Sequence, residues 1–295
     1  MTTSLLTRFA PFLILIAAML WATDAPFRVY LTKDLTSTFI VLGEHLVDVI
    51  IIAPILIAEW RTLKLLSAKE WLAILFIAIG GSALASIAFT EAFRYVNPSV
   101  AILLQKLQPL IAIGLSAIVL REKLVPRFWL FAVLAIAGAY LLSFPNIIPQ
   151  TFEGETLTLH SLGIGLALLA AFFWGASTVF GRLVLGKIDF KVMTGLRFSF
   201  AFLFLLVLAI SQNAFPAPGV LTGTDMLFIA IIALVSGVFS LLLYYKGLSH
   251  TRASVATIAE LGFPLAAVVI NWVVLDAVLS ATQLVGTAIL LFSVY

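Results

Sequence analysis

Ten apolar stretches follow one another along the chain, and each is close to the length of a helix that crosses a lipid bilayer. Such a helix needs about 20 predominantly apolar residues, and it satisfies its backbone hydrogen bonds internally. The sequence therefore predicts an all-α integral membrane protein with ten transmembrane helices. The expected spans are residues 9–30, 36–58, 71–94, 98–120, 126–144, 161–183, 191–211, 225–247, 252–275 and 280–295.

The composition agrees with lipid as the main solvent of the chain. Of its 295 residues, 63% are hydrophobic and 11% are charged, whereas a soluble domain has about 25% charged residues. The net charge of +3 does not indicate a nucleic-acid partner, because the basic residues are scattered through short loops. Since the chain has no cysteine, disulfides and thiolate chemistry are excluded.

The distribution of lysine and arginine predicts which way the helices point. Of the 17 such residues, 12 fall in loops on one side, while Arg28, Lys33 and Arg94 fall on the other. The remaining two, Lys106 and Arg197, lie inside spans. Cytoplasmic loops carry the excess of positive charge. Both termini are therefore expected in the cytoplasm.

The two halves of the chain resemble each other. Trp21 in the first span matches Trp174 in the sixth, and residues 95–124 align without gaps on residues 250–279. Nine of these 30 aligned positions are identical, and they include a proline in each half. Shared positions of rare residues such as tryptophan and proline favour a repeat over chance similarity between apolar helices.

The alignment predicts two five-helix repeats, residues 1–145 and 160–295, joined by a linker at 146–159. Because five is an odd number, the second repeat would be inverted relative to the first. Inverted repeats are typical of transporters that bind their substrate near the middle of the membrane, between the repeats.

These features resemble the EamA-type branch of the drug/metabolite transporter superfamily. The resemblance covers essentially the whole chain, and its most specific part is YVNPSVAILLQKLQPLIAIGLSAIVLREKL at 95–124. More narrowly, the chain is similar to bacterial aromatic amino-acid exporters. This implies a multi-pass protein of the bacterial inner (plasma) membrane that moves small metabolites out of the cytoplasm through a central cavity. One departure is Glu122, which aligns with Ala277, so a role of this glutamate does not transfer to the second half.

Charged residues inside spans are the first candidates for a substrate site. Each costs roughly 2.5–3.5 kcal/mol at mid-helix on insertion scales, so it usually faces protein, water or substrate. Lys106 lies eight residues from Pro98, which is about 12 Å deep. It could hold a substrate carboxylate, or it could form a structural pair with Glu44 or Glu260. Glu260, at a matching depth, could bind an ammonium group, pair with Lys106 or carry a proton.

Two prolines are expected to bend the helices beside these charges. Pro109 leaves the carbonyl of Gln105 without its helical donor, and Pro264 does the same for Glu260. Irregular backbone at membrane depth is tolerated where it lines a cavity or is buried in protein. A cavity is favoured over simple packing, because polar side chains coincide with the bends.

Trp21, Asp24 and Arg28 share one face of the first helix. Asp24 could contribute to the substrate site or simply pair with Arg28 along the helix. Trp21 and Trp174 lie deep for an interfacial belt and suit stacking on a planar ligand, although packing is the commoner role of such a residue.

The second helix carries Glu44, His45 and Asp48, and the position aligned with Glu44 is Arg197. Opposite charges at matching places predict a gate or a static salt bridge between the halves. His45 could titrate near neutral pH, which permits proton coupling. Tyr244 either lines an inner vestibule or, as the commoner alternative, anchors its helix at the membrane interface.

The sequence thus predicts an exporter of amino acids, aromatic ones by resemblance, that works by alternating access. Aromatic rings beside charges fit a zwitterion with an apolar side chain. An exchanger of anionic metabolites such as sugar phosphates, a channel and an intramembrane enzyme are alternatives, but the chain lacks a basic cluster, a filter-like loop and a catalytic motif. Enzyme activity, a cofactor and a metal are not expected. The expected partners are the small-molecule substrate and the lipid bilayer; the oligomeric state is not predicted, and a monomer is compatible with the sequence.

The residues expected to bind substrate are Lys106, Gln105, Glu260, Trp21, Trp174, His45 and Asp24. Those expected at a gate or ion pair are Glu44, Asp48, Arg197 and Tyr244, and Pro109 and Pro264 are the expected helix bends.

Overall fold

The computed structural model describes residues 2–96, 101, 104–105, 107–124, 126–143, 157–263, 266, 270 and 280–294, which form helices and turns with no strand among them. Within this part of the chain, six helical segments are long and apolar enough to cross a membrane: Phe9–Leu31, Ser37–Ala58, Ala68–Ala92, Ser161–Val184, Phe190–Ser211 and Gly223–Ser249. The other four predicted spans fall partly outside the described residues. The total of ten spans and the placement of the termini therefore stay predictions.

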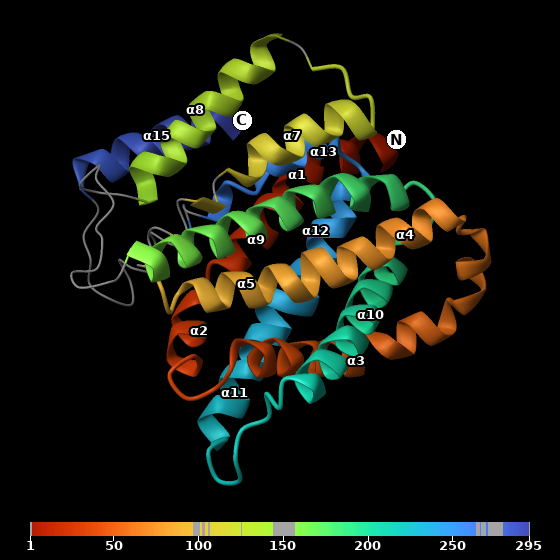
Figure 1. The fold of residues 1–295 in the computed structure, drawn as a ribbon. Helices are drawn as coiled ribbons and strands as arrows, with labels where there is room; N and C mark the ends of the chain where they lie inside the picture. The colour runs from red at the N-terminus through yellow and green to blue at the C-terminus, as the bar shows by residue number, and fades with distance from the viewer. Residues whose placement is uncertain are drawn as a thin grey trace.

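The helices follow one another as Figure 1 shows. The first half contains α1 (Thr2–Trp21), α2 (Ala25–Leu31), α3 (Ser37–Ala58), the 3-10 helix η1 (Trp60–Leu65), α4 (Ala68–Phe76), the π-helix η2 (Ile77–Leu84), α5 (Ala85–Ala92), α7 (Gln108–Val119) and α8 (Pro126–Ser143). The second half contains α9 (Leu157–Val184), α10 (Phe190–Ser211), α11 (Gly223–Ile231), the π-helix η3 (Ile232–Phe239), α12 (Ser240–Ser249), α13 (Ala253–Ala259) and α15 (Ala281–Val294).

The second half repeats the helix bounds of the first half at a nearly constant offset. Helix α10 begins and ends 153 residues after α3, and α11 and η3 begin and end 155 residues after α4 and η2. A capping box stands at the start of both α4 and α11. The residue just before the helix and an acidic residue three positions later bind each other's backbone N–H groups. The offset of 155 residues is the one that aligns residues 95–124 with 250–279.

In each half, the third span is one continuous helix with a π-helical segment in its middle. This segment is η2 in the first half and η3 in the second. Such segments insert an extra residue into a turn and often occur at functional sites. Close packing accompanies both. A Cβ atom on Gly81 would collide with Oγ of Ser177, and one on Gly237 would lie 2.5 Å from Oδ1 of Asp48. Only glycine lets the backbone approach these side chains so closely.

Helices of one half pack on helices of the other. The segment η2 lies against α9 and α10, while η3 lies against α1 and α3, and α3 and α10 also pack on each other. Helices α8 and α15 lie side by side at the top of the view in Figure 1. The centre of the bundle is therefore built from α1, α3, η2, α9, α10, η3 and α12, with the two π-helical segments on either side.

Candidate functional site

A cavity of about 140 Å³ lies between the two halves. Its ionisable wall residues are Asp24, Arg28, Glu44, His45, Asp48, Arg197 and Glu260. Its aromatic wall residues are Trp21, Phe89, Trp174, Phe198, Tyr244 and Phe263. Cavities of this kind, apolar with a few convergent polar groups, are the usual places for small-molecule binding.

The two tryptophans pack against aromatic residues of the opposite half. The ring of Trp21 lies 5.2 Å from that of Tyr244, and the ring of Trp174 lies 5.1 Å from that of Phe89. Phe89 and Tyr244 are themselves 155 residues apart. The matched pairs, tilted and edge-on, give the cavity an aromatic wall on each side.

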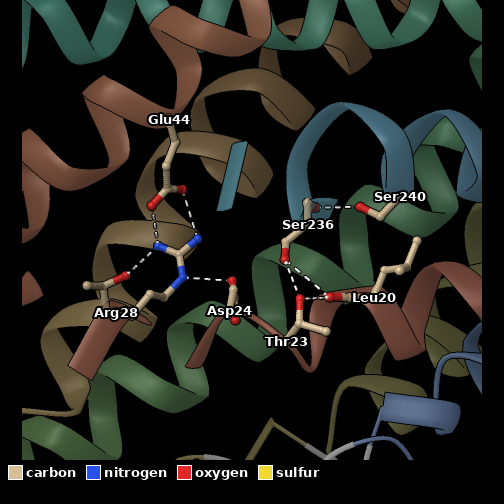
Figure 2. Close-up of polar contacts among 8 residues, drawn as sticks. Leu20, Thr23, Asp24, Arg28, Glu44, Ser236 and Ser240 are labelled. Carbon is tan, nitrogen blue, oxygen red and sulfur yellow. Dashed lines mark hydrogen bonds and ion pairs between the residues drawn. The ribbon is translucent and has the colours of Figure 1, made fainter. Parts of the chain in front are cut away.

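Arg28 holds two carboxylates in the first half, as Figure 2 shows. Its Nε atom lies 2.8 Å from Oδ2 of Asp24, and its two terminal nitrogens each lie 2.8 Å from an oxygen of Glu44. One terminal nitrogen also donates to Oγ1 of Thr90 at 3.1 Å. Charge-assisted bidentate pairs of this kind are strong, and they compensate the cost of burial.

The position of Arg28 corrects the sequence-based count of loop charges. Arg28 was expected on the outer side of the membrane, but it is 6% exposed and lies in α2, within the first apolar span. The hydropathy of the surrounding residues gives no sign of its partner, because Glu44 lies on another helix. Asp24 and Arg28 do pair along the helix, which was one of the two predicted roles of Asp24.

The first span is broken at residues 22–24, between α1 and α2, and the break is tied to η3 (Figure 2). The carbonyl of Leu20 accepts hydrogen bonds from Oγ1 of Thr23 at 2.7 Å and from Oγ of Ser236 at 3.2 Å. Ser240 in turn donates to the carbonyl of Ser236. This carbonyl also accepts from the backbone N–H of Thr23 at 3.1 Å, so the two hydroxyl donors, one of them from the opposite half, add to a turn at the break.

Arg197 occupies the place in the second half that Glu44 occupies in the first. Its guanidinium donates to Oγ of Ser82 at 3.1 Å, to the hydroxyl of Tyr245 at 2.9 Å and to the carbonyl of Gly81 at 2.9 Å. Among the described residues no carboxylate forms an ion pair with it. The ion-pair partner of Glu44 is therefore Arg28 and not Arg197.

His45 contacts its neighbours through both ring nitrogens. Its Nδ1 atom lies 2.8 Å from the carbonyl of Val41, and its Nε2 atom lies 2.9 Å from Oγ of Ser82. Because a carbonyl oxygen can only accept, Nδ1 carries the proton of the neutral ring, and Nε2 then accepts from the hydroxyl of Ser82.

Three oxygens on the cavity wall have no hydrogen-bond partner within the described part of the chain: Oδ1 of Asp48, Oε1 of Gln105 and Oγ of Ser177. Asp48 is 1% exposed, and its carboxylate lies against Gly237. Buried polar atoms are normally paired, so unpaired ones on residues that line a cavity are candidates for binding a substrate group or a proton.

Glu260 is the centre of a second polar cluster. The hydroxyls of Tyr244 and Thr178 lie 2.8 Å and 3.2 Å from its Oε1 atom, and the side-chain amide of Gln108 donates to its Oε2 atom. Tyr244 is 3% exposed and rests on the ring of Trp21. The expectation that Tyr244 anchors its helix at the interface is wrong, because its hydroxyl is used in the interior.

Comparison with known proteins places this architecture in a family. The model of the EamA-like transporter family matches the chain twice, at residues 8–144 and 161–295. The chain belongs to the EamA-like transporter family. It is a membrane transporter of small metabolites, as the sequence predicted.

This EamA-like transporter is 33% identical to the riboflavin transporter ImpX of Fusobacterium nucleatum subsp. nucleatum over 289 residues, which cover 96% of this chain and 95% of that one. A solved crystal structure covers 97% of this chain and 95% of its own, with a TM-score of 0.77 and 17% identity. At that identity the likeness shows the fold alone.

Most of the predicted site residues that the structure describes come together at this one cavity. The cavity wall includes Trp21, Trp174, His45, Asp24, Gln105 and Glu260, together with Glu44, Asp48, Arg197 and Tyr244. Lys106 and Pro264 lie outside the described residues, so their roles stay predictions. Pro109 lies in the first turn of α7, where its missing N–H leaves no helical bond unmade, and it therefore starts a helix there.

Sequence reasoning did not single out several wall residues. Phe89 and Ser177 become visible as candidates only through the repeat, because they align with Tyr244 and Asp24, whereas Thr178 aligns with Ala25 and carried no such signal. Gln108 and Ser82 carried no signal of their own, since single polar residues in apolar helices are common at packing interfaces.

Proposed function

We propose that this transporter carries a metabolite with a planar ring system and hydrogen-bonding substituents through the central cavity, and that a flavin such as riboflavin is its first candidate substrate. The observation that carries the proposal is the wall itself. Aromatic rings from both halves stand beside oxygens of Gln105 and Ser177 that have no hydrogen-bond partner within the described residues. A flavin offers a flat ring for stacking, together with ring N–H and ribityl hydroxyl groups that can donate to such oxygens.

The resemblance to a riboflavin transporter over 95% of its length supports the same substrate class. A flavin without phosphate is uncharged, and it therefore needs no free cation in the site. That matches the state of Arg28, whose donors are taken by Asp24, Glu44 and Thr90.

An aromatic amino acid is the second candidate, and Arg197 favours it. Its guanidinium lines the cavity and has only neutral acceptors among the described residues. A substrate carboxylate would form a charge-assisted hydrogen bond there. Export, cytoplasmic termini and ten spans in two inverted repeats complete the proposal, and the cross-packing of matched elements supports rocking of the halves by alternating access.

Counterflow in reconstituted vesicles tests the proposal. Vesicles that contain the purified protein are loaded with unlabelled riboflavin or unlabelled tryptophan, and the uptake of labelled substrate is followed. We expect saturable uptake of riboflavin that requires internal riboflavin, since a channel would show neither property. Uptake of tryptophan alone would move the assignment to the second candidate, and uptake of neither would contradict the substrate class.

A matched pair of tryptophan variants ties transport to the cavity. We expect Trp174→Ala to raise the apparent KM for riboflavin by about 5- to 150-fold, because base-like rings stack on aromatic side chains with roughly 1–3 kcal/mol. Trp129→Ala is the control, since Trp129 lies on α8 with 47% of its surface exposed. Equal effects of the two substitutions would show that the cavity wall does not bind the ring.

A further inference from the structure

Asp48 is a buried acid of the cavity wall that forms no ion pair within the described residues. It lies on α3, one turn after Glu44, and faces the π-helical segment η3. Its Oδ1 atom has no hydrogen-bond partner within the same part of the chain. Gly237 lies directly against Oδ1, so the carboxylate is held between η3 and the cavity.

The charged groups around Asp48 come from three elements. Glu44 and the neutral His45 lie on α3 itself, Arg28 reaches in from α2, and Arg197 reaches in from α10. The sequence of η3 contains no ionisable side chain, nor does that of η2. The remaining acids on elements that pack on α3 have their own contacts: Asp225 caps α11 through Thr222, and Glu91 on α5 pairs with Arg94.

Among the described groups named by the surroundings of Asp48, the carboxylates outnumber the guanidinium groups by one. Asp24, Glu44 and Asp48 face Arg28 and Arg197, and both oxygens of Glu44 are already bound to Arg28. A buried carboxylate with an unpaired oxygen costs several kcal/mol unless a cation compensates it. The compensating cation must fit a place beside Gly237 and near two guanidinium groups.

A proton fits that place better than a metal ion. Sodium and divalent ions need several oxygen ligands, and within the described residues no group of three acidic or histidine side chains could hold a metal. A proton needs one carboxylate oxygen. His45 is not the acceptor, because both of its nitrogens are engaged and Arg197 shares its partner Ser82.

We propose that Asp48 is the site of a coupled proton, which it takes up from water on one side of the membrane and releases on the other as the halves rock. The inference rests on the proposed transport function and deepens it. Asp48 faces η3, whereas Arg197 is held by η2, so a shift of one π-helical segment against the other changes the distance between the two charges. Approach of the guanidinium would favour release of the proton.

The Asp48→Asn variant separates coupling from transport. Wild-type protein and variant are reconstituted in vesicles, and riboflavin uptake is measured by counterflow without a gradient, under a pH gradient, and under a sodium gradient at uniform pH. We expect the wild type to accumulate riboflavin under the pH gradient alone. The variant is expected to keep counterflow within about twofold and to lose accumulation, because asparagine has a similar shape but binds no proton. Asp34→Asn, in an exposed turn, is the control and should behave like the wild type.

Three transport results would overturn the proposal, and so would one spectroscopic result. Loss of counterflow in a folded Asp48→Asn variant would make Asp48 a substrate ligand. Accumulation driven by sodium would assign another cation, and counterflow with no accumulation under either gradient would show an uncoupled carrier. Infrared difference spectra between two pH values need no substrate: the carboxylic C=O band of a protonated buried acid should be missing in the variant. Its persistence would refute the proton site even if riboflavin were not transported.

Discussion

The two halves place different charges at matching positions around the same cavity. In the first half, Arg28 is surrounded by Glu44, Asp24 and Thr90, and every donor direction that it uses ends on an oxygen of that half. The cluster neutralises most of its own charge. It joins α2, α3 and α5 into one unit without help from the second half.

In the second half the same positions hold Gly181, Arg197 and Tyr245, according to the offsets that relate the helix bounds. With no side chain at Gly181, the ring of Tyr245 fills the space that a side chain would take, and its hydroxyl accepts from Arg197. The other partners of Arg197, Ser82 and Gly81, belong to the first half. The second charge cluster therefore bridges the halves, whereas the first does not.

This difference separates the charges that stabilise the fold from the charges that are available for function. A charge paired within one half keeps its partners when the halves move, so it contributes stability in every state. A charge held by neutral groups across the boundary loses or exchanges contacts when they move. The expected effects of substitution differ accordingly.

Removing Arg28 should have the largest effect. Arg28→Met leaves Asp24 and Glu44 buried without their cation, and breaking a buried pair in this way costs about 3–5 kcal/mol. Arg197→Met removes only hydrogen bonds to neutral groups and should cost about 1–3 kcal/mol. The thermal unfolding midpoint of the purified protein in detergent measures both, with the exposed Arg61→Met as the control. Equal losses of stability in Arg28→Met and Arg197→Met would contradict the difference drawn between the two charge clusters.

Removing one carboxylate of the first cluster should cost less than removing the cation. In Glu44→Gln, Arg28 keeps Asp24 and Thr90, and the remaining pair is neutral. We expect a loss of about 2 kcal/mol, the value of hydrogen bonds to a charged group. In a double-mutant cycle, Arg28→Met combined with Glu44→Gln should cost less than the sum of the two. Strict additivity would mean that the two side chains do not act as a pair.

Filling the space at Gly181 should have a smaller effect that is specific to the second half. A Cβ atom there would lie 3.2 Å from the ring of Tyr245 and 3.3 Å from Leu248, so Gly181→Ala should cost about 1–2 kcal/mol by crowding. Gly165→Ala on the same helix meets nothing within 4 Å, and it should leave the unfolding midpoint unchanged or slightly raised. An unchanged unfolding midpoint in Gly181→Ala would show that the position of the Tyr245 ring does not depend on the space beside Gly181.

The smallest expected effect concerns the start of α13. Glu122 from the first half accepts from the backbone N–H of Ala253 at 3.0 Å and from the hydroxyl of Ser254 at 2.6 Å. Ser254→Ala should cost about 0.5–1 kcal/mol, since the backbone bond remains. Glu122→Gln should cost more, because it also weakens that bond. The aligned residue is Ala277, whose side chain has no oxygen that could accept such bonds.

Much of the site could be found from the sequence, because charged residues in apolar helices are rare and must face the interior. That rule selected Asp24, Glu44, Asp48, Arg197 and Glu260, all of which line the cavity. It could not assign partners, since helical spacing relates residues on one helix and says little about which helix lies opposite.

The π-helical segments were beyond prediction from hydropathy. The third and eighth predicted spans read as continuous apolar helices, and the extra residue in each changes the direction of side chains without changing their polarity. The contacts of Arg28 with Glu44 and of Tyr244 with Glu260 could not be predicted for another reason, because only the folded packing brings these helices together.

The matching π-helical segments also bear on the history of the chain. A π-segment arises when one residue is inserted into an existing α-helix, which rotates everything that follows by about 100° about the helix axis, one step at 3.6 residues per turn. If the two halves descend from one five-helix ancestor, a single insertion before duplication accounts for η2 and η3 beginning and ending at matching positions. The bulge would then be older than the charges around it, and Arg197 and Asp48 would be later and separate uses of one inherited irregularity.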